Sequence, residues 1–150
     1  MEKYDNQITL IMESRSQNEA LARTVVAAFI APLDPDLNTL TDVKTAVSEA
    51  VTNAVIHGYG NSIGEIILTM TIRNNELRIT VSDHGTGISD IHRAMEPLYT
   101  TAKPELERAG MGFTVMESFM DKVNVTSTSG KGTTVELIKD LNSGTSHFLV

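Results

Sequence analysis

The sequence contains no cysteine among its 150 residues. Disulfide bonds, zinc–thiolate sites and thiol catalysis are therefore excluded. Basic residues are scarce as well, because 12 lysines and arginines stand against 19 acidic residues and leave a net charge of −7. Non-specific binding of DNA or RNA requires a basic face. The composition thus argues against a nucleic-acid-binding protein and is compatible with a basic protein partner.

Long apolar runs are also missing, and none is long enough to span a bilayer. The first residues, Met-Glu-Lys-Tyr-Asp-Asn, lack a basic region followed by an apolar run, so no signal peptide is expected. The hydrophobic content of 41% and the charged content of 21% are those of an ordinary globular domain. We therefore predict one cytoplasmic domain over residues 1–150, with a flexible polar tail over about 141–150.

Hydrophobic periodicity predicts the secondary structure. The expected elements are an edge strand over residues 8–13, a helix over 18–31, a helix from 37 or 41 to about 57, a hairpin over 65–83, helices over 89–96 and 111–120, and strands over 123–128 and 133–138. The apolar stripe of the first helix is expected at Leu21, Val25, Ala28 and Phe29. Residues 97–110 are expected to be irregular. Because helices interrupt hairpins, we predict an α+β fold, a two-layer α/β sandwich with helices on one face of a mixed sheet.

Residues 48–57 are the part of the chain that most suggests chemistry. Glu49 and Asn53 are four residues apart, so their side chains lie one turn apart on the same helical face. An amide oxygen suits Mg²⁺, which also retains waters and substrate phosphates. A carboxylate can take a proton from a hydroxyl group or a water molecule. By itself, the same pair would also suit an ordinary half-exposed helix.

A glycine-rich turn, Asp83-His-Gly85-Thr-Gly87, follows a predicted strand. Its carboxylate could accept a hydrogen bond from the exocyclic amine of a purine, and the two glycines would let the base approach the backbone. A tight turn capped by an aspartate is the simpler alternative. The dinucleotide-binding fingerprint is excluded, because Asp90 stands where a third small residue is required.

Two further glycine pairs lie downstream. Gly110-Met-Gly112 precedes a predicted helix, and free N–H groups at a helix N-terminus favour an anion. A glycine-rich helix start without a ligand is the alternative. The run Gly-Lys-Gly-Thr-Thr over residues 130–134 does not match a phosphate loop, because Val125 stands where a glycine is needed. We interpret that run as a hairpin turn.

In this order, the Glu/Asn helix and the three glycine-containing segments resemble the ATP-binding (Bergerat, or GHKL) fold shared by type II topoisomerases, Hsp90 chaperones, histidine kinases and MutL proteins. Two blocks carry a closer resemblance: Ser-Glu-Ala-Val-Thr-Asn-Ala-Val-Ile-His-Gly-Tyr over residues 48–59 and Lys-Pro-Glu-Leu-Glu-Arg-Ala-Gly-Met-Gly-Phe over residues 103–113. They are similar to the anti-sigma-factor serine kinases of endospore-forming bacteria, and among these to the sporulation anti-sigma F factors. The likeness covers about residues 16–137.

The resemblance implies a regulator with two activities. It would hold a sigma factor of the sigma F type, and it would use ATP and Mg²⁺ to phosphorylate a serine on an anti-anti-sigma protein. The family also implies a homodimer, and the strand over residues 8–13 could pair across its two-fold axis. Arg23, on the outward side of the first helix, would contact a partner protein, although a solvated arginine is an equally good interpretation.

Roles for individual residues follow from the same resemblance. Glu49 matches the general base for the serine hydroxyl, Asn53 matches the Mg²⁺ ligand, and His57 would lie near the phosphates. Asp83 matches the acceptor for the adenine amine. Gly85 and Gly87 would let the base approach, and Thr134 matches a second adenine contact.

Residues of about 97–110 match the lid over the triphosphate. Its candidate phosphate contacts are Thr100, Thr101, Arg108, Gly110 and Gly112, of which Arg108 would neutralise charge and the glycines would supply backbone donors. Ala102 departs from the family pattern, in which the threonines adjoin the lysine, so the register of the threonines is in question. His84 replaces an acidic residue and is expected to point to solvent.

Three alternatives stay open at this stage. One is a non-enzymatic module in which the nucleotide only gates binding of a sigma factor. Another is a general-stress anti-sigma kinase in place of a sporulation one. The third, a detached catalytic domain of a histidine kinase, is disfavoured because none of the four histidines stands on a predicted dimerisation helix.

Overall fold

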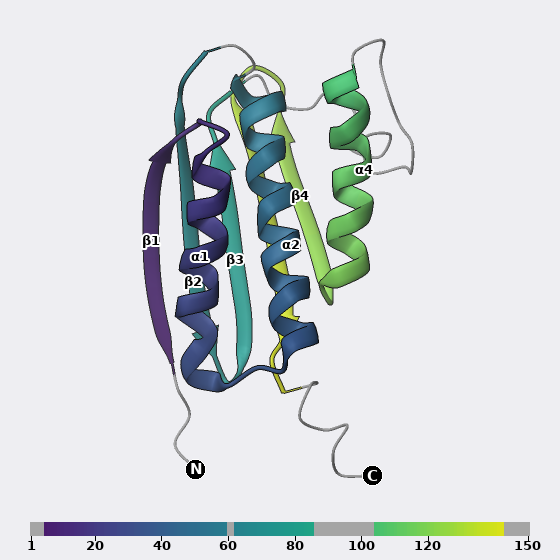
Figure 1. The fold of residues 1–150 in the computed structure, drawn as a ribbon. Helices are drawn as coiled ribbons and strands as arrows, with labels where there is room; N and C mark the ends of the chain where they lie inside the picture. Colours follow the sequence, from purple (N-terminus) through teal and green to yellow (C-terminus); the bar gives the residue numbers. More distant parts are fainter. Residues whose placement is uncertain (1–4, 60–61, 86–103, 143–150) are drawn as a thin grey trace.

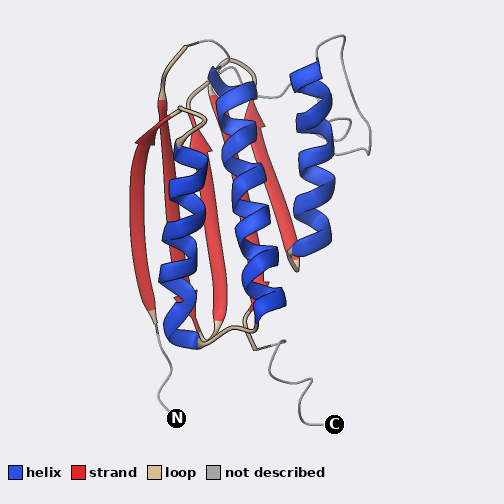
Figure 2. Cartoon of the chain, viewed as in Figure 1, coloured by secondary structure: helices blue, strands red, loops and turns tan. Residues whose placement is uncertain are grey.

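The computed structural model describes residues 5–59, 62–85 and 104–142 of the chain. Within these ranges, a five-stranded sheet is covered on one face by helices α1, α2 and α4 (Figure 2). Figure 1 shows the three helices side by side, with α2 in the middle. The α+β fold with helices on one face of a sheet is therefore confirmed.

The elements follow one another in simple order. They are β1 (Asn6–Glu13), α1 (Asn18–Ile30), the 3₁₀ turn η1 (Ala31–Leu33), α2 (Leu37–Asn53), the π-helix η2 (Ala54–Tyr59), β2 (Glu65–Arg73), β3 (Glu76–Asp83), α4 (Pro104–Phe119), β4 (Lys122–Thr128) and β5 (Gly132–Asp140). Asp36 caps α2, because its side chain accepts a hydrogen bond from the N–H of Thr39 at 2.7 Å. No described helix is long and apolar enough to cross a membrane.

The strand order is β1-β2-β3-β5-β4, and every neighbouring pair is antiparallel. The strand predicted at an edge, β1, does lie at an edge, but the expectation of a mixed sheet is wrong for the described strands. Helices α1 and α2 lie between β1 and β2 along the chain. They run down and back, so β2 begins beside the residue at which β1 ends. Among the described elements, α4 is the one that separates β3 from β4 along the chain. In the sheet, β5 lies between these two strands and is antiparallel to both.

The core lies between the helices and the sheet. The inward residues of β2 and β3 alternate with polar ones, as period-two patterning requires. The residues from these two strands that are 0% exposed are Ile66, Leu68, Met70, Ile72, Leu77 and Ile79. From α2, Val43, Ala46, Val47 and Val51 are equally buried. Glu49 lies at the flank of this buried face, one turn before Asn53 and beside Gly112 of α4.

Helix α1 buries a stripe that differs from the predicted one. Ala22, Val26, Phe29 and Ile30 are buried, whereas Leu21 is 45% exposed and Ala28 is also exposed. Both stripes have the spacing i, i+4, i+7, i+8, so periodicity alone allows either. The buried stripe includes both Phe29 and Ile30, which removes more apolar surface from water.

Helix α4 begins at Pro104, seven residues before the predicted start at 111. The prediction that residues 104–110 are irregular is therefore wrong. Proline is favourable in the first turn of a helix, and the following Glu, Leu, Glu, Arg and Ala are good helix formers. The two glycines that suggested a helix start lie inside this helix instead.

The expectation of a flexible tail from residue 141 is wrong at its first residues. Leu141 is 5% exposed, and its N–H donates to the Asn75 carbonyl at 2.9 Å. An apolar side chain next to the end of β5 gains more from the core than from solvent. The remainder of the predicted tail and the short helix predicted over 89–96 lie outside the described residues.

Candidate functional site

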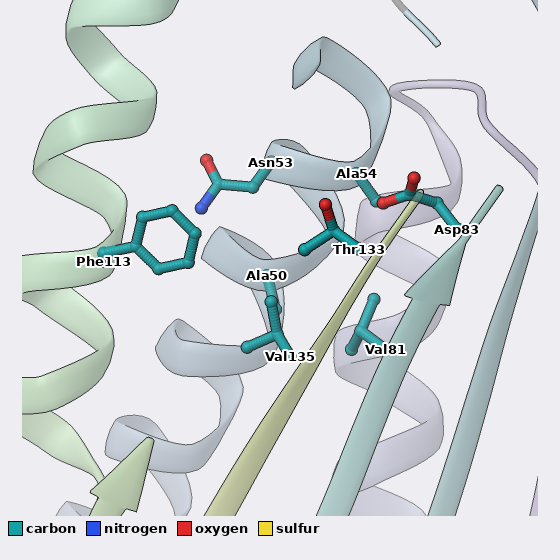
Figure 3. Close-up of a pocket in the computed structure, with 8 residues that line it drawn as sticks. All are labelled: Ala50, Asn53, Ala54, Val81, Asp83, Phe113, Thr133 and Val135. Carbon is teal, nitrogen blue, oxygen red and sulfur yellow. The ribbon is translucent and has the colours of Figure 1, made fainter. Parts of the chain in front are cut away.

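A small cavity opens between α2, α4 and the adjacent ends of β3 and β5 (Figure 3). Its lining residues are Ala50, Asn53, Ala54, Val81, Asp83, Phe113, Thr133 and Val135. The walls are mostly apolar, and the polar groups come from three separate elements. This lining has the composition of a small-molecule site, in which apolar walls bind and a few polar groups orient the ligand. The empty volume of the cavity, about 260 Å³, is smaller than the roughly 300–1,000 Å³ of most such sites.

Asn53, the last residue of α2, places its carboxamide beside this cavity. The residue is 4% exposed, and neither its Oδ1 nor its Nδ2 has a hydrogen-bond partner among the described residues. A buried amide without partners is costly for the fold. The carboxamide therefore keeps donor and acceptor capacity that a ligand or ion in the cavity could use.

Glu49 and Asn53 meet the same point on α4. A Cβ atom added to Gly112 would lie 3.0 Å from Glu49 Oε2 and 3.3 Å from both terminal atoms of the Asn53 amide. The predicted placement of the two side chains on one helical face is thus confirmed. The backbone of α4 can approach this pair so closely only because position 112 has no side chain.

Directly after Asn53, the helix widens into the π-helix η2. Single π-turns in longer helices frequently occur at functional sites. A Cβ atom added to Gly58 would lie 2.8 Å from Cγ of Asp83, so the end of η2 lies against that carboxylate. His57 belongs to this segment, but its side chain lies outside the described part of the structure.

Asp83 ends β3 and is 7% exposed. Burial raises the pKa of its carboxyl group, while the backbone N–H groups of Gly85 and Thr133 and the nearby His84 oppose that rise. The Gly85 N–H donates to Asp83 Oδ1 at 2.9 Å. The carboxylate is thus oriented by backbone donors at the edge of the cavity, with acceptor capacity left for a ligand.

Gly85 allows a close approach between two backbone segments, while its predicted role toward a purine base stays a prediction. A Cβ atom there would lie 1.6 Å from the carbonyl oxygen of Gly58, so no other residue fits without displacing the backbone. The other glycine of this turn, Gly87, lies outside the described residues, as do Thr100, Thr101 and Ala102.

Thr134 does not face the cavity. Its hydroxyl lies 3.0 Å from that of Ser82, on the sheet face that the helices leave uncovered. The preceding residue, Thr133, is 8% exposed and lines the cavity. Successive side chains of a strand point to opposite faces of the sheet. Thr133 therefore replaces Thr134 as the candidate ligand contact from β5.

The alternation of β5 could have identified Thr133 from sequence, since it shares its face with Val135 and Leu137. Phe113 was also missed. It is 1% exposed and points from α4 into the cavity, beside Asn53. Its sequence signal was weak, because an aromatic residue in a helix usually belongs to the core.

Gly110 and Gly112 lie in the interior of α4, where N–H groups bond to carbonyls four residues earlier. Their prediction as free donors at a helix N-terminus is therefore wrong for this conformation. The helix-forming residues that precede them extend α4 past both glycines. Arg108 belongs to the same helix, but its side chain lies outside the described part.

Arg23 lies on α1, away from this cavity. Its Nε is 3.2 Å from Glu19 Oε1, and its side chain is 42% exposed. Glu19 also accepts a hydrogen bond from Ser48 of α2, which links the surfaces of the two helices. Arg23 therefore lies in an ion pair at the surface of α1, and its contact with a partner protein stays a prediction.

Comparison with known proteins identifies the family to which the chain belongs. The sequence profile of the histidine kinase-like ATPase domain matches residues 12–139. The chain is 56% identical to the anti-sigma F factor of Thermoanaerobacter pseudethanolicus over 141 residues, which cover 94% of the chain and 98% of that protein. It is 55% identical to the anti-sigma F factor of Anoxybacillus flavithermus over 137 residues, or 91% of the chain and 93% of that protein.

Solved structures agree at the level of the fold. The RsbU and RsbW domains of Rv1364c from Mycobacterium tuberculosis match with a TM-score of 0.63 at 20% identity, covering 91% of this chain and 32% of that one. A blue-light activated histidine kinase, Erythrobacter litoralis EL346, matches with a TM-score of 0.57 at 26% identity, covering 75% and 34%.

Proposed function

Because the chain belongs to the anti-sigma F factor family of histidine kinase-like ATPases, we propose that it is an anti-sigma factor and a serine kinase. It holds a sporulation sigma factor of the sigma F type away from RNA polymerase in the cytoplasm. It also transfers the γ-phosphoryl group of ATP to a serine of an anti-anti-sigma protein, which then no longer binds. ATP binding itself is what the histidine kinase-like ATPase domain implies.

The observation that carries this proposal is the buried, partnerless carboxamide of Asn53. Its oxygen suits Mg²⁺, which in phosphoryl-transfer sites takes few protein ligands and otherwise binds water and phosphate oxygens. No group of three or more histidine or acidic side chains that could hold a metal occurs in the described part of the chain. The donor set thus fits a Mg²⁺ ion that arrives with the nucleotide, and Asn53 would be its protein ligand.

Bound Mg-ATP would supply the phosphoryl group and the cation that offsets its charge. Glu49, one turn before Asn53, would orient the serine hydroxyl and accept its proton. Arg108, together with Thr100 and Thr101, would contribute further phosphate contacts. His57 would lie near the phosphates.

At the other end of the cavity, the Asp83 carboxylate would accept a hydrogen bond from the adenine amine. Gly85 and Gly87 would keep this wall flat, and Val81 and Val135, which are paired on one face of the sheet, would contact one side of the base. Thr133 would supply a second polar contact from β5. An amine acceptor at this point favours adenine over guanine, which presents a carbonyl oxygen at the equivalent position.

Replacing Thr133 with valine is expected to weaken ATP binding by about 2- to 10-fold, the value of one neutral hydrogen bond. Valine keeps the shape of threonine, and it also removes the hydrogen bond of 2.8 Å between the Thr133 and Ser127 hydroxyls, a type of bond that Thr134 makes with Ser82. Titration calorimetry measures the effect. Thr134→Val is the matched control, because it changes the neighbouring residue on the opposite sheet face and is expected to leave the affinity unchanged. Equal losses in both variants would contradict the assignment of Thr133.

The partners would meet the surface of α1. Arg23 is a candidate contact for the sigma factor or the anti-anti-sigma protein. We also propose a homodimer, with the edge strand β1 as a candidate part of its interface. Net charge of −7 favours a basic surface on the partner.

The decisive experiment is incubation of the chain with the cognate anti-anti-sigma protein and ATP labelled on its γ-phosphate. We expect label on a serine of the partner, and none after chelation of Mg²⁺. In parallel, immobilised chain is presented with sporulation and general-stress sigma factors, with ATP and with ADP. Retention of the general-stress factor alone would contradict the sigma F assignment.

One observation favours a second candidate, a nucleotide-gated binding module without catalysis. Gly112 of α4 lies against both Glu49 and Asn53, so a ligand that contacts this pair would also displace or fix α4. Such a module would bind ATP and a sigma factor but transfer no label to the anti-anti-sigma protein.

A further inference from the structure

Tyr59 is the last residue of the π-helix η2, outside the cavity lining. Its hydroxyl donates a hydrogen bond to the carbonyl oxygen of Glu65 at 2.6 Å. The oxygen of the Tyr59 hydroxyl also accepts a hydrogen bond from the N–H of His84 at 2.8 Å. One phenol therefore joins three elements: the end of η2, the first residue of β2 and the residue that follows Asp83.

The aromatic ring of Tyr59 occupies space that a side chain at position 64 would fill. A Cβ atom added to Gly64 would lie 2.2 Å from Cε1 of Tyr59, so the ring packs directly on a residue without a side chain. Gly64 is fixed in turn, because its N–H donates to Ser14 Oγ at 2.9 Å and its carbonyl accepts the Ser14 N–H at 2.9 Å. The position of the phenol is thus determined from β1 as well as from its own helix.

The residues next to these bonds lie around Asp83, which lines the cavity. Gly58 precedes Tyr59 and lies against the Asp83 carboxylate, while Gly85 follows His84 and lies against the Gly58 carbonyl. The two backbones touch without side chains between them, so no apolar packing fixes their separation. At this point, the hydrogen bond between the Tyr59 hydroxyl and the His84 N–H joins η2 to the turn after β3.

We propose that Tyr59 is a positioning residue for base recognition. Its hydroxyl holds the His84 N–H, and thereby sets where the preceding carboxylate of Asp83 meets the base. The inference rests on the proposed ATP site. It adds a specificity-determining residue that contacts neither the base nor the phosphates.

The test is Tyr59→Phe, which keeps the ring and its packing on Gly64 and removes only the oxygen. We expect ATP affinity to fall by about 3- to 10-fold, in keeping with the loss of modest hydrogen bonds. Affinity for GTP should stay within about twofold, because guanine makes no use of a carboxylate acceptor at this position. The preference for ATP over GTP therefore shrinks, a change that a general loss of stability would not produce.

Ser62→Ala is the matched control. The Ser62 hydroxyl donates to the backbone carbonyl of the same tyrosine at 2.8 Å but makes no bond to the turn after β3. This variant should keep the full preference for ATP. Hydrogen exchange gives a second readout, and the His84 amide should exchange faster in Tyr59→Phe than in Ser62→Ala.

The outcomes separate the inference from the proposed function. If the unaltered chain prefers ATP and Tyr59→Phe retains that preference, the role of Tyr59 is refuted and the ATP site stands. If the unaltered chain binds ATP and GTP equally, base recognition by Asp83 is refuted, and the inference falls with it.

Discussion

Replacing Glu49 with glutamine is expected to lower the rate of serine phosphorylation by about 10²- to 10⁴-fold, the usual contribution of a general base. Glutamine has the same shape and can keep its place against Gly112, but it cannot accept the proton of the serine hydroxyl. ATP affinity should stay within about twofold, since the carboxylate acts on the acceptor and not on the nucleotide. Transfer of label from ATP to the anti-anti-sigma protein measures the rate.

Glu117→Gln is the control for this variant. Glu117 is an exposed glutamate of α4, so the substitution changes the net charge by the same amount without touching the cavity. A transfer rate within about twofold of normal in Glu49→Gln would rule out the proton-acceptor role. Loss of ATP binding in the same variant would instead place Glu49 in the nucleotide site.

Replacing Asp83 with asparagine is expected to weaken ATP binding by about 10- to 100-fold, which corresponds to a hydrogen bond made by a charged group. The asparagine oxygen can still accept the Gly85 N–H, so the turn is preserved. Asp42→Asn, three turns before Asn53 on α2, is the charge-matched control and should have no effect. Unchanged ATP affinity in Asp83→Asn would remove Asp83 from the site.

The same aspartate gives ATP binding a pH dependence. Burial raises the pKa of the Asp83 carboxyl group, so protonation begins at a higher pH than the ordinary value near 4. The charged form exists above the raised pKa, and ATP affinity should fall as the pH falls through it. The free energy of unfolding depends on pH in the opposite sense. Burial of the charged carboxylate lowers it above the raised pKa, and this cost is lost as the pH falls below that pKa. Asp83→Asn should lose both dependences.

Much of this site could be predicted because its residues lie in regular elements. Glu49 and Asn53 are separated by one helical turn, and no tertiary information is needed to place them on one face. The same holds for the hairpin of β2 and β3, whose alternating residues determine both the strands and their inward face.

The wrong predictions for α1, α4 and β5 each have a local physical cause. Both stripes of α1 satisfy helical periodicity, and only packing against the sheet chooses between them. Gly110 and Gly112 suggested a helix start, but the helix-forming residues before them outweigh the cost of two interior glycines. Thr134 was assigned by its likeness to a motif, whereas its face depends on a strand register that Val135 and Leu137 already indicate.

The topology could not be obtained from the order of the elements alone. A mixed sheet and the observed antiparallel one share the same succession of helices and strands. The difference depends on β5 lying between β3 and β4, which is a long-range pairing. Local propensity carries no information about such a choice.

The π-helix Ala54–Tyr59 constrains the length of the chain as well as its composition. Each residue of an α-helix turns by about 100° around the axis. A π-turn holds about one residue more than an α-turn, so deleting one residue would let a regular α-helix continue with the residues beyond it near their present direction. Inserting one residue would instead rotate the residues beyond it by about that angle. Gly58 would then leave Asp83, and the phenol of Tyr59 would point away from His84. The number of residues between Asn53 and Gly58 is therefore as important for the site as their chemistry, and a one-residue insertion there would be more damaging than most substitutions.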